Sequence, residues 1–170
     1  MYIIYLLISA MFSLNGFYDY AIKDTRGIEI QLSSFRGKKV LLVNTASNSN
    51  YVNQYESLER LYQQYKNQLV IIAFPSNDFG HEPEDNAGIQ SFVKSHYDVH
   101  FILSEKTNVF GSAKCQVYQW LTQNINNGVI NNEVKTDFYK FLIDESGNLV
   151  GVFSPSVDPM SDELRSVIPN

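Results

Sequence analysis

Apolar residues along the chain follow two alternating spacings, which predicts strands interleaved with helices. Residues 38–44 (KKVLLVN) and 69–75 (LVIIAFP) are nearly continuous apolar runs, typical of strands buried on both faces of a parallel sheet. Between these runs, apolar residues recur at steps of three and four, as on one face of a helix: Tyr51, Val52, Tyr55, Leu58, Leu61, Tyr62 and Tyr65. The pattern therefore predicts a right-handed strand–helix–strand unit. We place the N-cap of the helix at Ser49 or Asn50.

The rest of the chain predicts shorter elements of the same kinds. Residues 17–24 and 28–32 flank a turn at Gly27 and predict an N-terminal hairpin, and residues 138–144 and 149–153 predict a second one. We expect helices near 89–95 and 115–123, a strand near 100–103, a loop over the Asn-rich segment 122–134, and a last helix that Ser161 opens. The sum is an α/β domain with a central mixed sheet of four or five strands and helices on both faces.

Composition narrows the function classes. A length of 170 residues fits one domain, and the net charge of −5 with scattered basic residues argues against nucleic-acid binding. Cys115 is the single cysteine, so the chain has no internal disulfide, and His81, His96 and His100 lack the spacing of metal ligands. We therefore expect no metal and no cofactor.

The N-terminus is apolar and uncharged through Leu14. This stretch is too short to span a bilayer as a helix, but its length suits the apolar region of a signal peptide. Because no Lys or Arg precedes it and no clean cleavage site follows, the alternative is an extra apolar element packed on the domain. We divide the chain into residues 1–16, a signal peptide or apolar extension, and a domain of residues 17–170. We favour an exported protein, periplasmic or secreted, over a cytoplasmic one.

Three long segments resemble the glutathione peroxidase family in order and spacing. They are VNTASNSNYVNQYESLERLYQQY (43–65), IIAFPSNDFGHEPEDN (71–86) and DFYKFLIDESGNLVGVFSPSVDP (137–159). The resemblance spans residues 17–168 and implies a thioredoxin-like fold with an N-terminal hairpin. It also implies an oxidoreductase of the oxidative-stress response, because the family reduces hydroperoxides with a cysteine or selenocysteine. Glutathione or thioredoxin would be a partner only of an active enzyme.

The residues at the family's catalytic positions differ from the family pattern. The resemblance places the reactive residue at Ser49, and it places Asp78, Thr136 and Asp137 where the family has glutamine, tryptophan and asparagine. Ser76 replaces a family cysteine, and the resolving cysteine of thioredoxin-dependent members falls near Val93. The remaining residues of the expected pocket are Asn48, Asn50 and Asn77.

These substitutions remove the chemistry that peroxide reduction needs. A thiolate attacks the O–O bond and passes through a sulfenic state that another thiol reduces, whereas a serine hydroxyl has no such oxidised state. Asp78 and Asp137 also place hydrogen-bond acceptors where the family has donors, and their negative charge disfavours a nearby anion. A single engineered change from cysteine to serine would have left the other catalytic positions intact. We therefore expect little or no peroxidase activity.

Four hypotheses remain open at this stage. We favour a degenerate family member that keeps the fold as a binding or interaction protein. The alternative is an active thiol-dependent peroxidase that uses Cys115 or the thiol of a partner. A hydrolase built on Ser49, Asp78 and His81 has the residue types of a triad but no predicted geometry. A divalent cation between Asp78 and Asp137, with an oxygen from Asn48 or Asn77, is the fourth.

Overall fold

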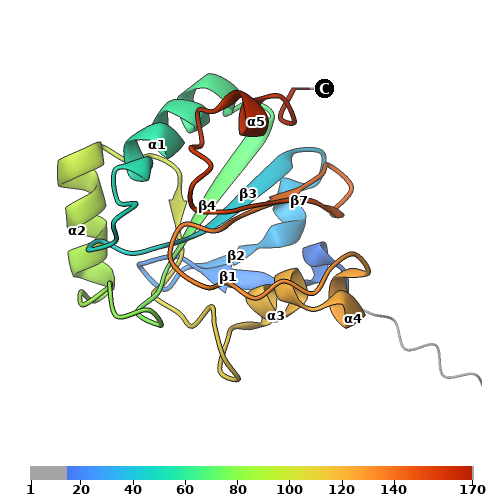
Figure 1. Ribbon diagram of the computed structural model, residues 1–170, viewed down its shortest axis with the longest axis horizontal. Helices are drawn as coiled ribbons and strands as arrows, with labels where there is room; N and C mark the ends of the chain where they lie inside the picture. Colours follow the sequence, from blue (N-terminus) through green and yellow to red (C-terminus); the bar gives the residue numbers. More distant parts are fainter. Residues whose placement is uncertain (1–14, 170) are drawn as a thin grey trace, which may run out of the picture.

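The computed structural model describes residues 15–169, and a five-stranded mixed sheet forms its centre (Figure 1). The strand order is β5-β4-β3-β6-β7, with bounds β3 (Lys39–Thr45), β4 (Leu69–Pro75), β5 (Ile102–Leu103), β6 (Lys140–Ile143) and β7 (Leu149–Phe153). Strand β3 pairs parallel to β4 and antiparallel to β6, so it lies in the middle of the sheet. The predicted mixed sheet is confirmed, with five strands.

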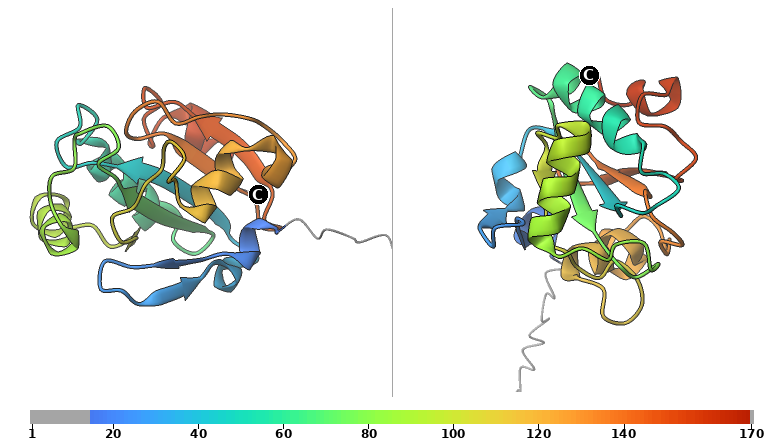
Figure 2. Two further views of the ribbon diagram at one scale, coloured as in Figure 1. Left: turned by 90° about the horizontal axis from the view of Figure 1, so that it is seen from below. Right: turned by 90° about the vertical axis from the view of Figure 1, so that its left-hand side faces the viewer.

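Each face of the sheet has its own layer, as predicted (Figures 1 and 2). On one face, Leu41 and Val43 pack with α1 (Gln54–Tyr65), α2 (Asn86–Tyr97) and α5 (Asp162–Arg165). On the other face, Val40 and Leu42 pack with α3 (Gln116–Thr122), with η1 (Phe17–Asp19) and η2 (Leu32–Phe35), and with the antiparallel hairpin of β1 (Ala21–Lys23) and β2 (Glu29–Gln31). Alternate side chains of one buried strand thus supply both cores.

The predicted start of the first long helix is wrong. Helix α1 begins at Gln54 with Asn53 as its N-cap, and not after Ser49 or Asn50. Before it, the N–H of Val52 bonds to the Ser49 carbonyl at 3.1 Å and the N–H of Gln54 to the Tyr51 carbonyl at 2.9 Å. Such bonds between residues three apart make tight turns. Ser49 therefore lies in a turn ahead of the helix.

The smaller elements follow the sequence pattern closely. Helix α2 extends beyond the predicted 89–95 because the Asp85 side chain caps it by accepting from the N–H of Gly88 at 2.8 Å. Cys115 is the N-cap of α3, and Ser161 caps α5 by accepting from the N–H of Leu164 at 3.4 Å. The Asn-rich segment is a loop apart from the short α4 (Asn124–Asn127).

The first described residues are tied to distant parts of the chain. The Tyr18 hydroxyl donates to the Glu145 carbonyl at 3.0 Å, and the Phe17 and Trp120 ring centroids lie 5.7 Å apart. Gly147 has a φ of 94°, and a Cβ placed there would lie 2.6 Å from the Tyr18 ring. Only glycine fits that turn. Residues 1–14, on which the signal-peptide hypothesis depends, lie outside the described residues.

Within residues 15–169, the helices are all too short or too polar to cross a membrane.

Candidate functional site

A buried carboxylate joins the loop after β3 to the loop after β4. Glu82 has no exposed surface, and its two oxygens accept from the N–H and the hydroxyl of Ser47, each at 2.8 Å. The N–H of Asn48 also donates to the His81 carbonyl at 2.9 Å. These contacts fix the reactive loop of the resembled family against the second motif. Sequence reasoning missed Glu82. The only sequence signal for it is its place beside His81 in the second resembling segment, residues 71–86.

Ser49 has a structural role in this loop. Ser49 is 4% exposed, and its Oγ accepts from the N–H of Tyr51 at 3.2 Å. Among residues 15–169, the structure provides no imidazole or carboxylate that hydrogen-bonds to this hydroxyl. The hydroxyl stabilises the turn before α1, and it has no base beside it that would make it a nucleophile.

Asp78 serves a different loop from Ser49. One carboxylate oxygen accepts from the N–H groups of Val109 and Phe110 at 2.6 and 2.9 Å, and the other accepts from the Asn108 side chain at 2.8 Å. The Ser76 hydroxyl donates to the same carboxylate at 3.0 Å. The structure therefore does not join Asp78 to Asp137 or to Ser49.

The cation hypothesis gains no support from this geometry. Asp78 and Asn77 line a polar cavity of about 570 Å³ together with Asp85 and Lys106. In the described part of the chain, no three His, Cys, Asp or Glu side chains gather closely enough to hold a metal ion. Two separated carboxylates do not supply the oxygen ligands that a hard cation needs.

Asp137 and His81 form a pair in which the carboxylate is buried and the imidazole is partly exposed. Asp137 has no exposed surface, and its Oδ2 lies 2.6 Å from the Nδ1 of His81. The other carboxylate oxygen is buried and has no partner among the described residues, while the His81 side chain is 43% exposed. With Nδ1–H donated to the carboxylate, Nε2 is the ring nitrogen left for another partner, and it accepts a hydrogen bond when the ring is neutral. The alternative triad of Ser49, Asp78 and His81 does not form, because the acidic partner of His81 is Asp137.

The backbone beside Asp137 is strained and held in place from both sides. Phe138 has a φ of 63°, a left-handed conformation that an aromatic residue rarely adopts and that costs on the order of 1 kcal/mol. Asn44 fixes it, since its carbonyl accepts from the N–H of Phe138 at 2.6 Å and its side chain donates to the Thr136 carbonyl at 3.0 Å. Thr136 thus contributes its backbone to this site, and the two Asn44 contacts hold the chain on both sides of Asp137.

Tyr55 and Lys140 are two further buried titratable groups of the domain. Burial raises the pKa of Tyr55 on α1, and the carboxylates of Glu82 and Asp137 raise it further, so its hydroxyl keeps its proton. Lys140 begins β6 and is fully buried, with its Nζ donating to the carbonyls of Phe138 at 2.9 Å and Ser154 at 3.5 Å. Burial lowers the pKa of Lys140 to about 7, although the Asp158 carboxylate opposes this shift.

The remaining predicted residues lie apart from a common reactive centre. Asn48 and Asn50 are exposed, and Val93 is a core residue of α2. Cys115 lines a separate cavity of about 350 Å³ with Ala21, Phe74 and Ser104. Burial raises the pKa of the Cys115 thiol, which leaves it protonated and weakly nucleophilic.

Comparisons with known proteins agree on one family. A sequence profile described as glutathione peroxidase matches residues 17–122. A protein of Citrus sinensis named probable phospholipid hydroperoxide glutathione peroxidase is 38% identical over 154 residues, which cover 89% of this chain and 92% of that protein. A glutathione peroxidase of Lactococcus lactis is 35% identical over 157 residues, with 90% and 99% covered. The crystal structure of Trgpx in apo form matches with a TM-score of 0.70 at 31% identity, covering 92% of this chain and 97% of that one.

Proposed function

Because this chain belongs to the glutathione peroxidase family but has serine at the reactive position, we propose that it has lost hydroperoxide reduction and serves as a binding protein. The observation that carries the proposal is the role of Ser49. Its buried hydroxyl accepts from the N–H of Tyr51 and lies in a turn. An alcohol in that role neither ionises at neutral pH nor forms a stable oxidised state that a thiol can reduce.

Cys115 is a poor substitute for the missing thiolate. It occupies the N-cap of α3 beside another cavity, and burial raises the pKa of its thiol. Peroxide attack depends on the thiolate, so the protonated form reacts slowly. Glutathione or thioredoxin would be needed as a reductant only if Cys115 or a partner's thiol did react.

We expect no turnover of hydrogen peroxide or an organic hydroperoxide above the uncatalysed rate, because the chain has no reactive thiolate at its loop. The measurement is NADPH consumption in coupled assays with the glutathione system and with the thioredoxin system. Cys115→Ala is the matched variant, and it is expected to behave like the wild type. Wild-type turnover that Cys115→Ala abolishes would establish the peroxidase alternative instead.

The binding half of the proposal rests on His81. Its ring is half exposed while Asp137 occupies Nδ1, which leaves Nε2 for a ligand. In the neutral ring, Nε2 accepts from an O–H or N–H donor. Such a group is oriented before the ligand arrives, which lowers the entropic cost of binding.

We expect small molecules with such donors to stabilise the wild type in a thermal-shift screen, and to lose at least half of that shift in His81→Gln. The matched control is His96→Gln, because His96 is exposed on α2 and its Nδ1 lies 2.9 Å from the Phe92 carbonyl of the same helix, not beside a carboxylate. Compounds that stabilise all three proteins equally would place the binding site elsewhere.

A further inference from the structure

The cavity beside Cys115 lies between the β1–β2 hairpin and α3, on the face of the sheet opposite α1 (Figure 1). Its inner wall is apolar, because it includes the buried side chains of Ile22 from β1, Phe74 from β4 and Val117 from α3. Its volume of about 350 Å³ falls within the range of roughly 300–1,000 Å³ that is usual for ligand pockets. The cavity is therefore large enough for a small organic ligand.

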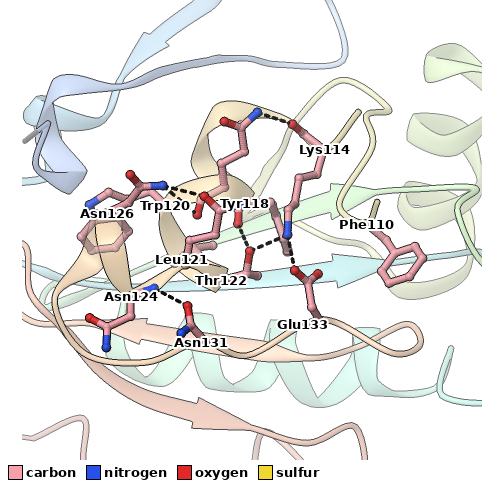
Figure 3. A network of polar contacts seen from close by, with 12 residues as sticks. Phe110, Lys114, Tyr118, Trp120, Leu121, Thr122, Asn124, Asn126, Asn131 and Glu133 are labelled. Carbon is pink, nitrogen blue, oxygen red and sulfur yellow. Dashed lines mark hydrogen bonds and ion pairs between the residues drawn. The ribbon is translucent and has the colours of Figure 1, made fainter. Parts of the chain in front are cut away.

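The α3 wall of this cavity is fixed by contacts between the two ends of the helix. The Lys114 side chain is 6% exposed, and its Nζ donates to the Thr122 hydroxyl at 2.9 Å and to Glu133 at 2.6 Å (Figure 3). The Gln119 side chain donates to the Lys114 carbonyl at 2.9 Å. Because these bonds already hold the wall in shape, a ligand does not have to order it, which lowers the entropic cost of binding.

The charged residues that line the cavity leave one carboxylate without a basic partner. These residues are Lys23 and Glu29, which are exposed, and Glu105, which is partly buried. Lys23 and Glu29 stand directly opposite each other in the β1–β2 register, so their opposite charges offset one another. Among residues 15–169, the Glu105 carboxylate has no ion pair or hydrogen bond. The excess charge of the cavity is therefore the negative charge of Glu105.

We propose that this cavity binds a small organic cation, namely a protonated amine that carries one apolar group. The apolar group packs against Phe74 and its neighbours, where it is removed from water. The ammonium pairs with Glu105, whose partial burial reduces the screening of the attraction by water. An anion meets repulsion from Glu105 instead. His81 and Asp137 do not line this cavity, so the proposal is independent of the function proposed for His81.

The first test compares three ligands that share an aromatic ring and differ in charge: phenethylamine, phenethyl alcohol and phenylacetate. Isothermal titration calorimetry on the full wild-type chain measures their Kd values. We expect phenethylamine to bind roughly fivefold or more tightly than phenethyl alcohol, because a partly shielded ion pair contributes about 1 kcal/mol. Phenylacetate should bind more weakly than the alcohol.

The variant Glu105→Gln removes the charge and keeps the shape of the side chain. We expect it to bind phenethylamine as weakly as phenethyl alcohol, while its affinity for the alcohol stays that of the wild type. The matched control is Glu163→Gln, because Glu163 is exposed on α5, which packs on the other face of the sheet. This control should keep the full preference for the amine.

The second test locates the ligand through Cys115, which is the single cysteine of the chain and lines the cavity. Mass spectrometry follows the rate at which a maleimide modifies its thiol. At a phenethylamine concentration ten times its Kd, we expect this rate to fall by about tenfold, because only the unoccupied protein reacts.

Four results would overturn the proposal. They are a wild type that binds none of the three ligands, equal binding of the amine and the alcohol, a Glu105→Gln variant that still prefers the amine, and amine binding that leaves the rate of Cys115 modification unchanged. The last result would place the bound amine outside the cavity. The ligand comparison and the Cys115 measurement use the wild type alone, so they decide the question even if Glu105→Gln does not fold.

Discussion

Replacing Lys140 with methionine is expected to raise the free energy of unfolding by ~2 kcal/mol at pH 6. Lys140 is fully buried, and burial lowers its pKa from 10.5 to about 7. At ~1.4 kcal/mol for each pKa unit, holding the charged amine inside costs on the order of 5 kcal/mol. Methionine removes this cost but also the hydrogen bonds to Phe138 and Ser154, which offsets roughly 1–3 kcal/mol of the gain.

The pH dependence gives the sharper test of Lys140. Between about pH 7 and 10.5, the unfolded chain holds the proton that the folded chain has released, so wild-type stability rises with pH across this window. The advantage of Lys140→Met should therefore be largest below pH 7 and shrink toward pH 10. Urea unfolding of both proteins at several pH values measures it, with the exposed Lys135→Met as control. A difference between variant and wild type that stays constant from pH 6 to 10 contradicts a depressed pKa.

Glu82→Ala is expected to lower the free energy of unfolding by ~3 kcal/mol. The change leaves the N–H and hydroxyl of Ser47 without their buried partner and opens a cavity where the carboxylate was. In a domain of this size, that loss corresponds to a fall in melting temperature of roughly 6–12 °C. Calorimetry or circular dichroism measures the change directly.

A matched acidic residue stands two positions away. Glu84 is exposed, so Glu84→Ala should change stability by less than ~0.5 kcal/mol. Ser47→Ala and the double variant complete a cycle, in which we expect the two sites to couple by at least ~1 kcal/mol. If Glu82→Ala lowered the free energy of unfolding no more than Glu84→Ala, the contact between Glu82 and Ser47 would contribute nothing to stability.

The sequence predicts the layers of this fold well because buried apolar residues recur at regular spacings along the chain. The runs at 38–44 and 69–75 became β3 and β4 almost to the residue, and the thioredoxin-like fold of glutathione peroxidase type is confirmed. The ends of the helices are harder to predict from the sequence. Ser49 has the chemistry of an N-cap, but its hydroxyl stabilises a turn instead, and local propensity does not distinguish these two uses.

The sequence predicts which positions belong to the candidate site, but it does not predict which contacts their side chains make. The sequence places Asp78 and Asp137 in loops that end near one edge of the sheet. In the structure, however, Asp78 accepts from the backbone N–H groups of Val109 and Phe110, and Asp137 pairs with His81. These pairings join loops far apart in the sequence, so neither spacing nor residue type encodes them. The left-handed backbone of Phe138 leaves no sequence signal either, because glycine or asparagine is the usual residue for it.

The long-range ties of Tyr18 have a consequence for the order of folding. Its hydroxyl bonds to Glu145, and its ring lies so close to Gly147 that any side chain there would collide with it. A chain that emerges from the ribosome N-terminus first thus makes Tyr18 long before it makes the hairpin that receives it. Closing such distant contacts is slow. We therefore expect η1 and its aromatic residues to dock last, after the β6–β7 hairpin is complete.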